Sequence, residues 1–244
     1  MDYQHQWHGG AATNLPVGKL VCVGRNYAAH ARELGNEVPD APIIFLKPST
    51  SAVTLEPEFS IPVGQGECHF ETEITLLIGQ RLAVPAQKGK AVSAQSNSAT
   101  NETSALQEVS AENARAAIAG IGLGLDLTLR EKQNELKAKG QPWELAKAFD
   151  GSAPLSSFLP VTNFPDLAAV KFSLSINGER RQSGDSADMI TDMIALLQFI
   201  TRYITLLPGD VVMTGTPAGV AALHSGDALT LQLADVATWQ TRVL

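Results

Sequence analysis

The stretch HFETEITLLIG, residues 69–79, places two carboxylates at the start of an apolar run. The run predicts a β-strand, in which side chains two residues apart point to the same face, so Glu71 and Glu73 are expected to lie together. Two carboxylates on one face repel each other, and a half-buried sheet disfavours their charge further. The stretch therefore predicts a strand that needs a positive counter-charge, such as a bound cation.

The composition is that of a globular chain with a full core. Of the 244 residues, 44% are apolar and 18% are charged, and the formal net charge is −7. This length allows one large domain or two small ones. Because no long basic run is present, nucleic acid is not an expected partner.

The cysteines and the apolar segments indicate a cytoplasmic protein without a membrane segment. Cys22 and Cys68 lie far apart and have no metal-ligand spacing, so no disulfide framework is expected. The N-terminal residues 1–10 lack the pattern of a signal peptide. The most apolar stretch, residues 116–125, is about half as long as a helix that spans a bilayer.

Strands outnumber helices in the predicted order of elements. A turn at Asn177-Gly178 is the strongest short signal for a hairpin, here within residues 171–183. Strands and helices do not alternate strictly, which favours a strand-dominated α+β fold over a doubly wound sheet. The other expected strands are 19–24, 42–48, 73–79, 210–215, 228–233 and 238–244. A short helix is expected over 25–35, where Gly35 closes it. Residues 111–130 are expected to run from a helix into a strand, and residues 186–206 have a helical apolar face.

One segment differs from the rest in composition. Residues 83–110 are rich in Ala, Ser, Gln, Asn and Thr and contain almost no large apolar side chain. Such a segment cannot bury enough surface to order itself well. We expect a single domain over residues 1–244 that carries this segment as a polar, low-complexity surface insertion.

A third carboxylate is expected beside the two glutamates. Asp126 interrupts the apolar run GLGLDLTL, residues 122–129, where a lone charge is costly unless it is paired or coordinated. A ligand set made only of oxygen favours Mg²⁺, Mn²⁺ or Ca²⁺ over zinc. The alternative is that Glu71 and Glu73 face solvent, which is the commoner meaning of a short E-x-E motif. His69 on the same face is either a structural histidine or a partner of a ligand.

A possible acid–base pair and several cations accompany these carboxylates. His30 and Glu33 are three residues apart, so in a helical turn the carboxylate can orient the imidazole. An exposed surface pair is the alternative. Lys47 and Lys147 lie among apolar neighbours, where lysines are uncommon unless paired. These lysines and Arg25 either bind an acidic substrate or extend to the surface.

Six stretches, in this order along the chain, resemble the fumarylacetoacetate hydrolase (FAH) family, especially its short acylpyruvase and oxaloacetate-acting members. The resemblance covers about residues 19–244. The stretches are VCVGRNYAAHARELG (21–35), PIIFLKPST (42–50), HFETEITLLIG (69–79), GLDLTLREKQNELKAKGQPWELAKAFDGSAPLS (124–156), INGERRQSGDSADMI (176–190) and LLPGDVVMTGTPAGV (206–220). Residues 83–110 are longer and more polar than the usual connection in the family.

The resemblance implies a fold, an assembly and a role for each matching residue. The fold would be a mixed β-sandwich roll, and the protein a homodimer. The roles are as follows: Glu71, Glu73 and Asp126 would bind Mg²⁺ or Mn²⁺, with Ca²⁺ as a substitute; His30 and Glu33, on a lid, would deprotonate water; Lys147 would steady an oxyanion; and Arg25, Lys47, Gln133 and Thr216 would surround the substrate or the metal.

The main expectation is hydrolysis of a 3-acylpyruvate, such as fumarylpyruvate or acetylpyruvate, to pyruvate and a carboxylic acid. His30, oriented by Glu33, would activate water for attack on the distal carbonyl, and Lys147 would stabilise the tetrahedral oxyanion. The alternative uses the same site to tautomerise or decarboxylate oxaloacetate, or for an isomerase or hydratase step in aromatic breakdown. A metal-binding scaffold without catalysis is disfavoured, because both members of the acid–base pair are present.

Overall fold

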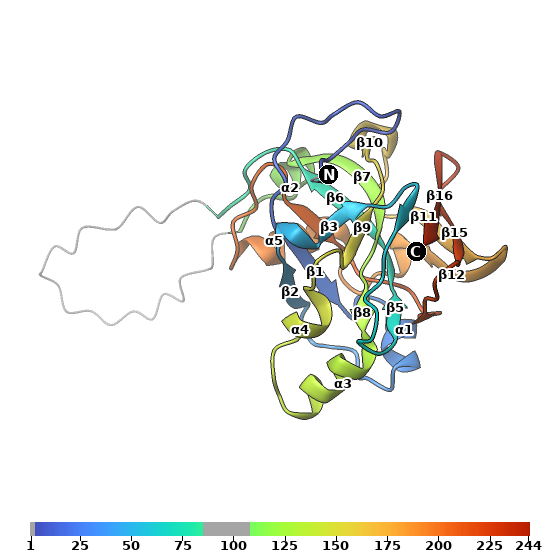
Figure 1. The fold of residues 1–244 in the computed structure, drawn as a ribbon. Coiled ribbons are helices and arrows are strands. Elements are labelled where there is room, and N and C mark those ends of the chain that lie inside the picture. The colour runs from blue at the N-terminus through green and yellow to red at the C-terminus, as the bar shows by residue number, and fades with distance from the viewer. Residues whose placement is uncertain (1–2, 85–107) are drawn as a thin grey trace, which may run out of the picture.

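In a computed structural model that describes residues 3–84 and 108–244, the chain is built mainly from strands that form three sheets (Figure 1). The largest sheet has eight strands, in the order β2 (Ile43–Lys47), β1 (Leu20–Gly24), β13 (Val211–Met213), β6 (Thr72–Ile78), β7 (Ile118–Leu125), β9 (Ala153–Leu155) and β3 (Ala52–Thr54), with β10 (Leu159–Pro160) paired to β7. A five-stranded sheet contains β12 (Glu179–Asp185), β11 (Lys171–Ile176), β15 (Ala228–Leu233), β16 (Ala237–Val243) and β4 (Glu58–Phe59). The third sheet joins β14 (Ala221–Ala222), β5 (Cys68–Phe70) and β8 (Thr128–Leu129).

Helices are few and short in the described part of the chain, which confirms the predicted strand-dominated α+β class. They are α1 (Ala28–Glu33), α2 (Ala111–Ala116), α3 (Arg130–Ala138), α4 (Glu144–Lys147) and α5 (Met193–Thr201), with three 3₁₀ turns at Ser49–Ser51, Val161–Asn163 and Ser186–Asp188. Helix α3 packs on α4, and α2 packs on α5 on another side of the sheets (Figure 1). None of the helices in the described residues is long and apolar enough to cross a membrane.

Strands β6 and β7 form the centre of the largest sheet. The predicted strand over 73–79 is confirmed, and every residue of β6 is buried. In β7, glycines at 120, 122 and 124 alternate with buried apolar residues. A Cβ on Gly122 would lie 2.8 Å from Ser156 Oγ, and one on Gly124 would lie 2.8 Å from Leu155 Cδ2. The glycines therefore let the chain around β9 and β10 lie directly on β7.

Two local predictions are confirmed by their backbone conformations. Asn177 and Gly178 have φ values of +52° and +83°, and they connect the antiparallel strands β11 and β12 as a tight hairpin. Helix α1 ends as predicted, because Gly35 adopts a φ of +65° and its N–H bonds to the carbonyl of Arg32.

The helix predicted over 186–206 is shorter than expected. Asp192 caps α5 by accepting hydrogen bonds from the N–H groups of Ile194 and Ala195, each at 2.9 Å. Before that cap, the N–H of Thr191 donates to the side chain of Asn26 at 2.9 Å instead of to a helical carbonyl. After α5, Leu206 and Leu82 exchange backbone hydrogen bonds at 2.9 Å. Both ends of the predicted helix are thus used in contacts with other segments.

The predicted polar insertion at 83–110 lies mostly outside the described residues, which omit 85–107. Its flanking positions can be described. Leu82 and Val109 are both buried, and the Val109 carbonyl accepts a hydrogen bond from Gln198 on α5 at 2.7 Å. The two sides of the segment therefore meet the core beside α5.

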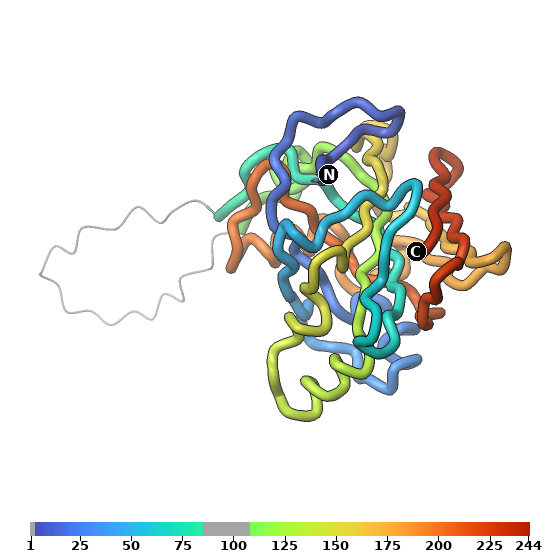
Figure 2. The backbone as a smooth tube through the Cα atoms, viewed as in Figure 1, coloured from blue at the N-terminus to red at the C-terminus, as the bar shows by residue number. Residues whose placement is uncertain are grey.

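The N-terminal segment runs beside the chain at β10 (Figure 2). The N–H of His8 donates to the Phe158 carbonyl at 2.8 Å. His5 is 2% exposed; its Nε2 donates to the Gly209 carbonyl at 2.9 Å, and its Nδ1 lies 3.1 Å from the Tyr3 hydroxyl. A neutral imidazole fits both contacts, and burial lowers the pKa of His5 below its ordinary value.

The free energy of unfolding is expected to decrease as the pH is lowered, and part of this decrease depends on His5. The unfolded chain protonates His5 at its ordinary pKa of 6.5, whereas the folded chain holds it neutral to lower pH. The unfolded state therefore binds more protons below about pH 6.5, and the free energy of unfolding decreases there by at most about 1.4 kcal/mol per pH unit. Urea unfolding between about pH 5 and 7 should show a weaker pH dependence in His5→Gln.

A control for this measurement is His224→Gln, because the His224 side chain is 78% exposed. Burial also lowers the pKa of His30, so part of the pH dependence should persist in His5→Gln. An identical pH dependence in His5→Gln and the parent protein would contradict the assignment.

Candidate active site

Three carboxylates meet where β5 ends, β6 begins and β7 ends. Glu71 lies at the break between β5 and β6, Glu73 follows in β6, and Asp126 comes directly after β7. The N–H of Asp126 donates to the Glu71 carbonyl at 2.8 Å, which fixes the two residues side by side. One ligand atom from each carboxylate lies within 4.8 Å of the others, and all three residues are buried. The structure thus brings together the predicted triad, and the solvent-facing alternative is wrong.

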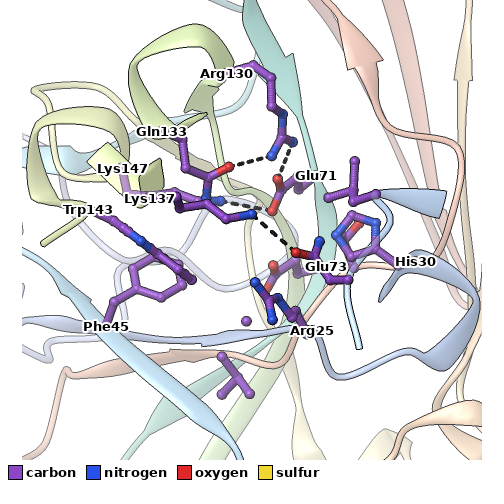
Figure 3. A pocket seen from close by; sticks show the side chains of 15 residues that line it. Arg25, His30, Phe45, Glu71, Glu73, Arg130, Gln133, Lys137, Trp143 and Lys147 are labelled. Atoms are coloured by element: carbon purple, nitrogen blue, oxygen red, sulfur yellow. Dashed lines mark hydrogen bonds and ion pairs between the residues drawn. The ribbon is translucent and has the colours of Figure 1, made fainter. Parts of the chain in front are cut away.

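Two cations hold Glu71 (Figure 3), and one of them also holds Asp126. Lys147, at the end of α4, donates to Glu71 Oε2 at 2.9 Å and to Asp126 Oδ2 at 2.6 Å. Arg130, at the start of α3, donates to Glu71 Oε1 at 2.6 Å. Burial alone would raise the pKa of Glu71, but the charges of Lys147 and Arg130 outweigh it and hold that pKa below its ordinary value. Burial likewise opposes the charge of Lys147, but Asp126 and Glu71 raise its pKa, so the ammonium stays protonated.

Lys47 lies behind the triad and is fully buried. Its Nζ is 2.9 Å from Asp126 Oδ1 and 3.0 Å from the Ser152 carbonyl, and it also donates to the carbonyl of Lys147. It does not line the cavity in front of the triad. In the described structure Lys47 is a counter-charge for Asp126, and its predicted contact with substrate stays a prediction.

Removing the charge of Lys47 is expected to destabilise the fold strongly. Lys47→Met leaves buried Asp126 with one cation in place of two, and breaking a buried ion pair costs about 3–5 kcal/mol. Urea unfolding without added metal should show a loss of that size. Lys171→Met is the control, because Lys171 is an exposed lysine at the start of β11. A loss below about 1 kcal/mol for Lys47→Met would contradict this account.

The carboxylates fit a hard divalent cation. Glu73 accepts a hydrogen bond from the Gly215 N–H at 2.7 Å, but it forms no ion pair with any residue that the structure describes. Burial, and then the charge of Asp126, raises the pKa of Glu73 well above its ordinary value. Asp126 Oδ1, by contrast, already has the Lys47 ammonium at 2.9 Å as a counter-charge. A bound cation would supply a counter-charge to Glu73, the member of the triad that has no cationic partner among the described residues. A ligand set made of oxygen atoms favours Mg²⁺ or Mn²⁺.

His30 lies beside this cluster on α1 (Figure 3). Its side chain is 5% exposed, and its Nδ1 lies 3.5 Å from Glu33 Oε2. Burial lowers the pKa of His30, although the charges of Glu71 and Glu33 oppose that shift. Glu33 is partly exposed and accepts hydrogen bonds from the Gly219 N–H at 3.0 and 3.1 Å. The pair therefore provides a neutral imidazole whose orienting carboxylate is anchored to another loop.

A cavity opens in front of the triad. Arg25 reaches it from the residue after β1, where a φ of +57° turns the chain away from the strand. Gln133 on α3 accepts a hydrogen bond from Arg130 at 2.6 Å. The lining includes Glu71 and Glu73, the predicted residues Arg25, His30, Gln133, Lys147 and Thr216, and also Arg130, Lys137, Phe45 and Trp143.

Polar side chains behind the cavity fix its walls. Thr216 donates to the Thr72 carbonyl at 2.9 Å, between the two glutamates. Gln182 accepts from the Thr72 N–H at 2.9 Å and donates to Thr216 Oγ1 at 2.8 Å. Gln182 thereby links β12 of the five-stranded sheet to β6, at a residue between Glu71 and Glu73. His69, by contrast, contacts Glu67 at 3.0 Å and does not line this cavity.

Sequence reasoning missed Arg130, Lys137 and Gln182. Arg130 and Lys137 occur in the charged run REKQNELKAK, residues 130–139, which has the pattern of an exposed surface. The only available signal for Arg130 was its spacing from Gln133, which places the two side chains on one helical face. No local signal identifies Gln182, because its partners lie far away in the sequence.

The strand-dominated fold with its mixed sheets matches solved members of the fumarylacetoacetate hydrolase family, and the chain belongs to that family. It matches the family model described as "Fumarylacetoacetate (FAA) hydrolase C-terminal" over residues 19–94 and 102–244. The resemblance noted in the sequence and the expected FAH-type fold are both confirmed.

Particular relatives cover nearly the whole chain. An oxaloacetate tautomerase of Escherichia coli (strain K12) is 44% identical over 243 residues, which are 99% of this chain and 100% of that protein. A solved FAH family protein from Yersinia pestis CO92 is 42% identical, with a TM-score of 0.87 and coverage of 99% of this chain and 100% of that chain. A fumarylpyruvate hydrolase from Pseudomonas aeruginosa, solved with Mn²⁺ and pyruvate, is 31% identical, with a TM-score of 0.83 and coverage of 100% and 96%.

Proposed function

We propose that the protein is a divalent-metal-dependent oxaloacetate tautomerase, which interconverts the enol and keto forms of a four-carbon 2-oxo acid. The observation that carries the proposal is the 44% identity, over 99% of this chain, to an oxaloacetate tautomerase. The geometry supports it, because two carboxylates of the acidic triad, a buried imidazole and several cations line one cavity, and a carboxylate oxygen of Asp126 lies within 4.8 Å of those two carboxylates. Acylpyruvate hydrolysis, the main expectation from the sequence, has support from relatives of lower identity, at 31%.

The triad Glu71, Glu73 and Asp126 would hold the cation, Mg²⁺ or Mn²⁺. When bound, such a cation acts as a Lewis acid that polarises the 2-oxo acid and makes its neighbouring C–H bond more acidic.

His30 is the residue we assign to proton transfer. Its imidazole lines the cavity, and the lowered pKa keeps it neutral and able to accept a proton near neutral pH. It would take the proton from carbon 3 of the keto form and return a proton to the enol oxygen, so that no water is consumed. Glu33 would orient the imidazole through the 3.5 Å contact. Lys147 would place its fixed positive charge where the substrate oxygen gains negative charge.

The remaining predicted residues would bind the substrate. Arg25 and Gln133 line the cavity with a guanidinium and an amide N–H, which are suited to carboxylate oxygens. Thr216 lines it with a hydroxyl that already donates to the Thr72 carbonyl, so Thr216 would contact the substrate without donating to a carboxylate. A homodimer in the cytoplasm remains our expectation for the assembly and location, and sedimentation of the purified protein would check the dimer.

The test follows ketonisation of enol-oxaloacetate by ultraviolet absorbance, with Mg²⁺, with Mn²⁺ and with chelator. The proposal expects conversion that depends on the metal and exceeds the buffer background. Metal-loaded protein that leaves the rate at background would overturn it. Carbon dioxide release, measured in parallel, separates tautomerisation from decarboxylation.

A second candidate is the acylpyruvate hydrolase. The His30–Glu33 contact favours it, because the same pair can activate a water molecule, and a relative solved with pyruvate is a fumarylpyruvate hydrolase. The matched assay uses acetylpyruvate and fumarylpyruvate with detection of pyruvate. Stoichiometric pyruvate alongside inert enol-oxaloacetate would establish the hydrolase in place of the tautomerase. Neither assay detects an isomerase or hydratase step in aromatic breakdown, which no contact in the described site favours.

A further inference from the structure

One face of helix α3 carries a row of polar side chains into the cavity. Arg130, Gln133 and Lys137 are spaced at i, i+3 and i+7, so they lie on the same side of the helix. All three line the cavity in front of the triad. The row begins at the triad itself, where Arg130 contacts Glu71 at 2.6 Å.

Lys137 stands at the end of the row that is remote from the triad. Seven residues of helix separate its Cα from that of Arg130 by about 10 Å along the axis. Helical side chains lean toward the helix N-terminus, so the long side chain of Lys137 extends back toward Gln133. Lys137 also lines an adjoining cavity, together with Arg130, Leu34 and Asn134.

Lys137 differs in its partners from Lys132 on α3 and from Lys139, the residue directly after α3. Lys132 and Lys139 both pair with Glu135, at 2.7 Å. Lys137 forms no ion pair with a residue in the described ranges; its Nζ donates only to Asn36 Oδ1, at 3.3 Å. Burial, and then the charges of Arg25 and Arg130, lowers the pKa of Lys137. The cavity thus gathers cations that repel each other, and an anionic ligand would relieve that repulsion.

We propose that Lys137 binds the distal carboxylate of a dicarboxylic acid whose 2-oxo or 2-hydroxy end faces the triad, and that it makes the site prefer dicarboxylates to monocarboxylates. The inference rests on the proposed function only for that orientation of the ligand. The near end of the ligand is matched by the triad and its cation, whereas the distal end meets the ammonium at the far end of the α3 row. Lys137 is therefore a specificity-determining residue for the site.

The test compares two ligands that differ only at the distal group. Malate carries a carboxylate where 2-hydroxybutyrate carries a methyl group, and both offer a carboxylate and a 2-hydroxyl to a divalent cation. Calorimetric titration with Mg²⁺ present should show malate bound at least about tenfold more tightly by the parent protein, as expected for a charge-assisted hydrogen bond. In Lys137→Gln this preference should fall to within about twofold, while the affinity for 2-hydroxybutyrate stays unchanged.

Two further variants control the comparison. Lys139→Gln removes the lysine directly after α3, which pairs with Glu135, and should keep the preference. Lys137→Arg keeps the charge and should restore most of it. If Lys137→Gln weakens both ligands equally, the side chain acts by holding the segment at Asn36, and the proposal is overturned. A preference for malate that survives in Lys137→Gln overturns it as well.

Because the titration involves no turnover, its outcome is separate from that of the activity assay. Lys137-dependent binding of malate without conversion of enol-oxaloacetate would reject the tautomerase and keep the specificity assignment. Conversion of enol-oxaloacetate without a Lys137-dependent preference for malate would keep the tautomerase and reject the specificity assignment.

Discussion

Glu73→Gln is expected to abolish divalent-metal binding and leave the metal-free protein at least as stable as the parent. Glu73 is the member of the triad without a cationic partner, and burial and the charge of Asp126 disfavour its ionised form. The amide oxygen of Gln can still accept the hydrogen bond from the Gly215 N–H. Loss of one of three carboxylate ligands should weaken Mg²⁺ or Mn²⁺ binding by at least about 100-fold.

Thermal unfolding with and without metal measures both effects at once. Metal should raise the midpoint of the parent protein, as linkage requires, and should not raise that of Glu73→Gln. Glu135→Gln is the matched control, since Glu135 is an exposed glutamate on α3. If Glu73→Gln keeps the full metal-dependent shift, the triad is not the metal site.

Asp126→Asn is expected to differ from Glu73→Gln in its effect on stability. Asp126 is the partner of both Lys47 and Lys147, so its neutralisation leaves two buried ammonium groups short of counter-charge. We expect this variant to lose metal binding and also about 3 kcal/mol or more of stability. Equal stability of Asp126→Asn and Glu73→Gln would show that the lysine contacts contribute less than their geometry indicates.

The second large effect is expected from His30→Gln, which should lower kcat by about 10²- to 10⁴-fold and leave metal affinity within about threefold. His30 lines the cavity, but the acidic triad that would bind the metal is formed without it. Glu33→Gln should have a smaller effect, because Glu33 orients the imidazole and does not itself line the cavity in front of the triad. Initial rates of ketonisation and metal titrations measure the two quantities separately.

His69→Gln is the control, because His69 is a nearby histidine that contacts Glu67 and lies outside the triad's cavity. A comparable loss of kcat in His69→Gln would argue against a specific role for His30. Full activity in His30→Gln would assign the proton transfer to another group, and Lys147 would be the next residue to vary.

Periodicity predicted the elements that bury an apolar face. Strands β6 and β7 were found because their apolar runs are long, and the turn at Asn177-Gly178 because its residues favour positive φ. Helix α3 was not found, because its inner face carries Arg130, Gln133 and Lys137 toward the cavity. A helix whose inner face is polar shows no apolar stripe.

The triad could be predicted because a carboxylate in an apolar run needs a partner, whichever fold contains it. The sequence does not show in the same way which lysines and arginines line the cavity. Lys137 and Lys139 are two residues apart in one charged run, yet one lines the cavity and the other pairs with Glu135. Likewise, only the packing of β2 against residues 126–152 shows that Lys47 lies behind the triad.

The contacts of Lys47 have a consequence for which ions the site accepts. One ammonium joins β2 to the carbonyls of Leu127, Lys147 and Ser152, so the backbone directly after Asp126 is tied to two later segments when the chain folds. Conformational entropy for the ligand set is then lost in folding and not again on metal binding. A ligand set held in this way adjusts little to the radius of the bound metal ion. It should favour ions with short bonds, about 2.1 Å for Mg²⁺, over Ca²⁺, which needs about 2.3–2.6 Å and more ligands.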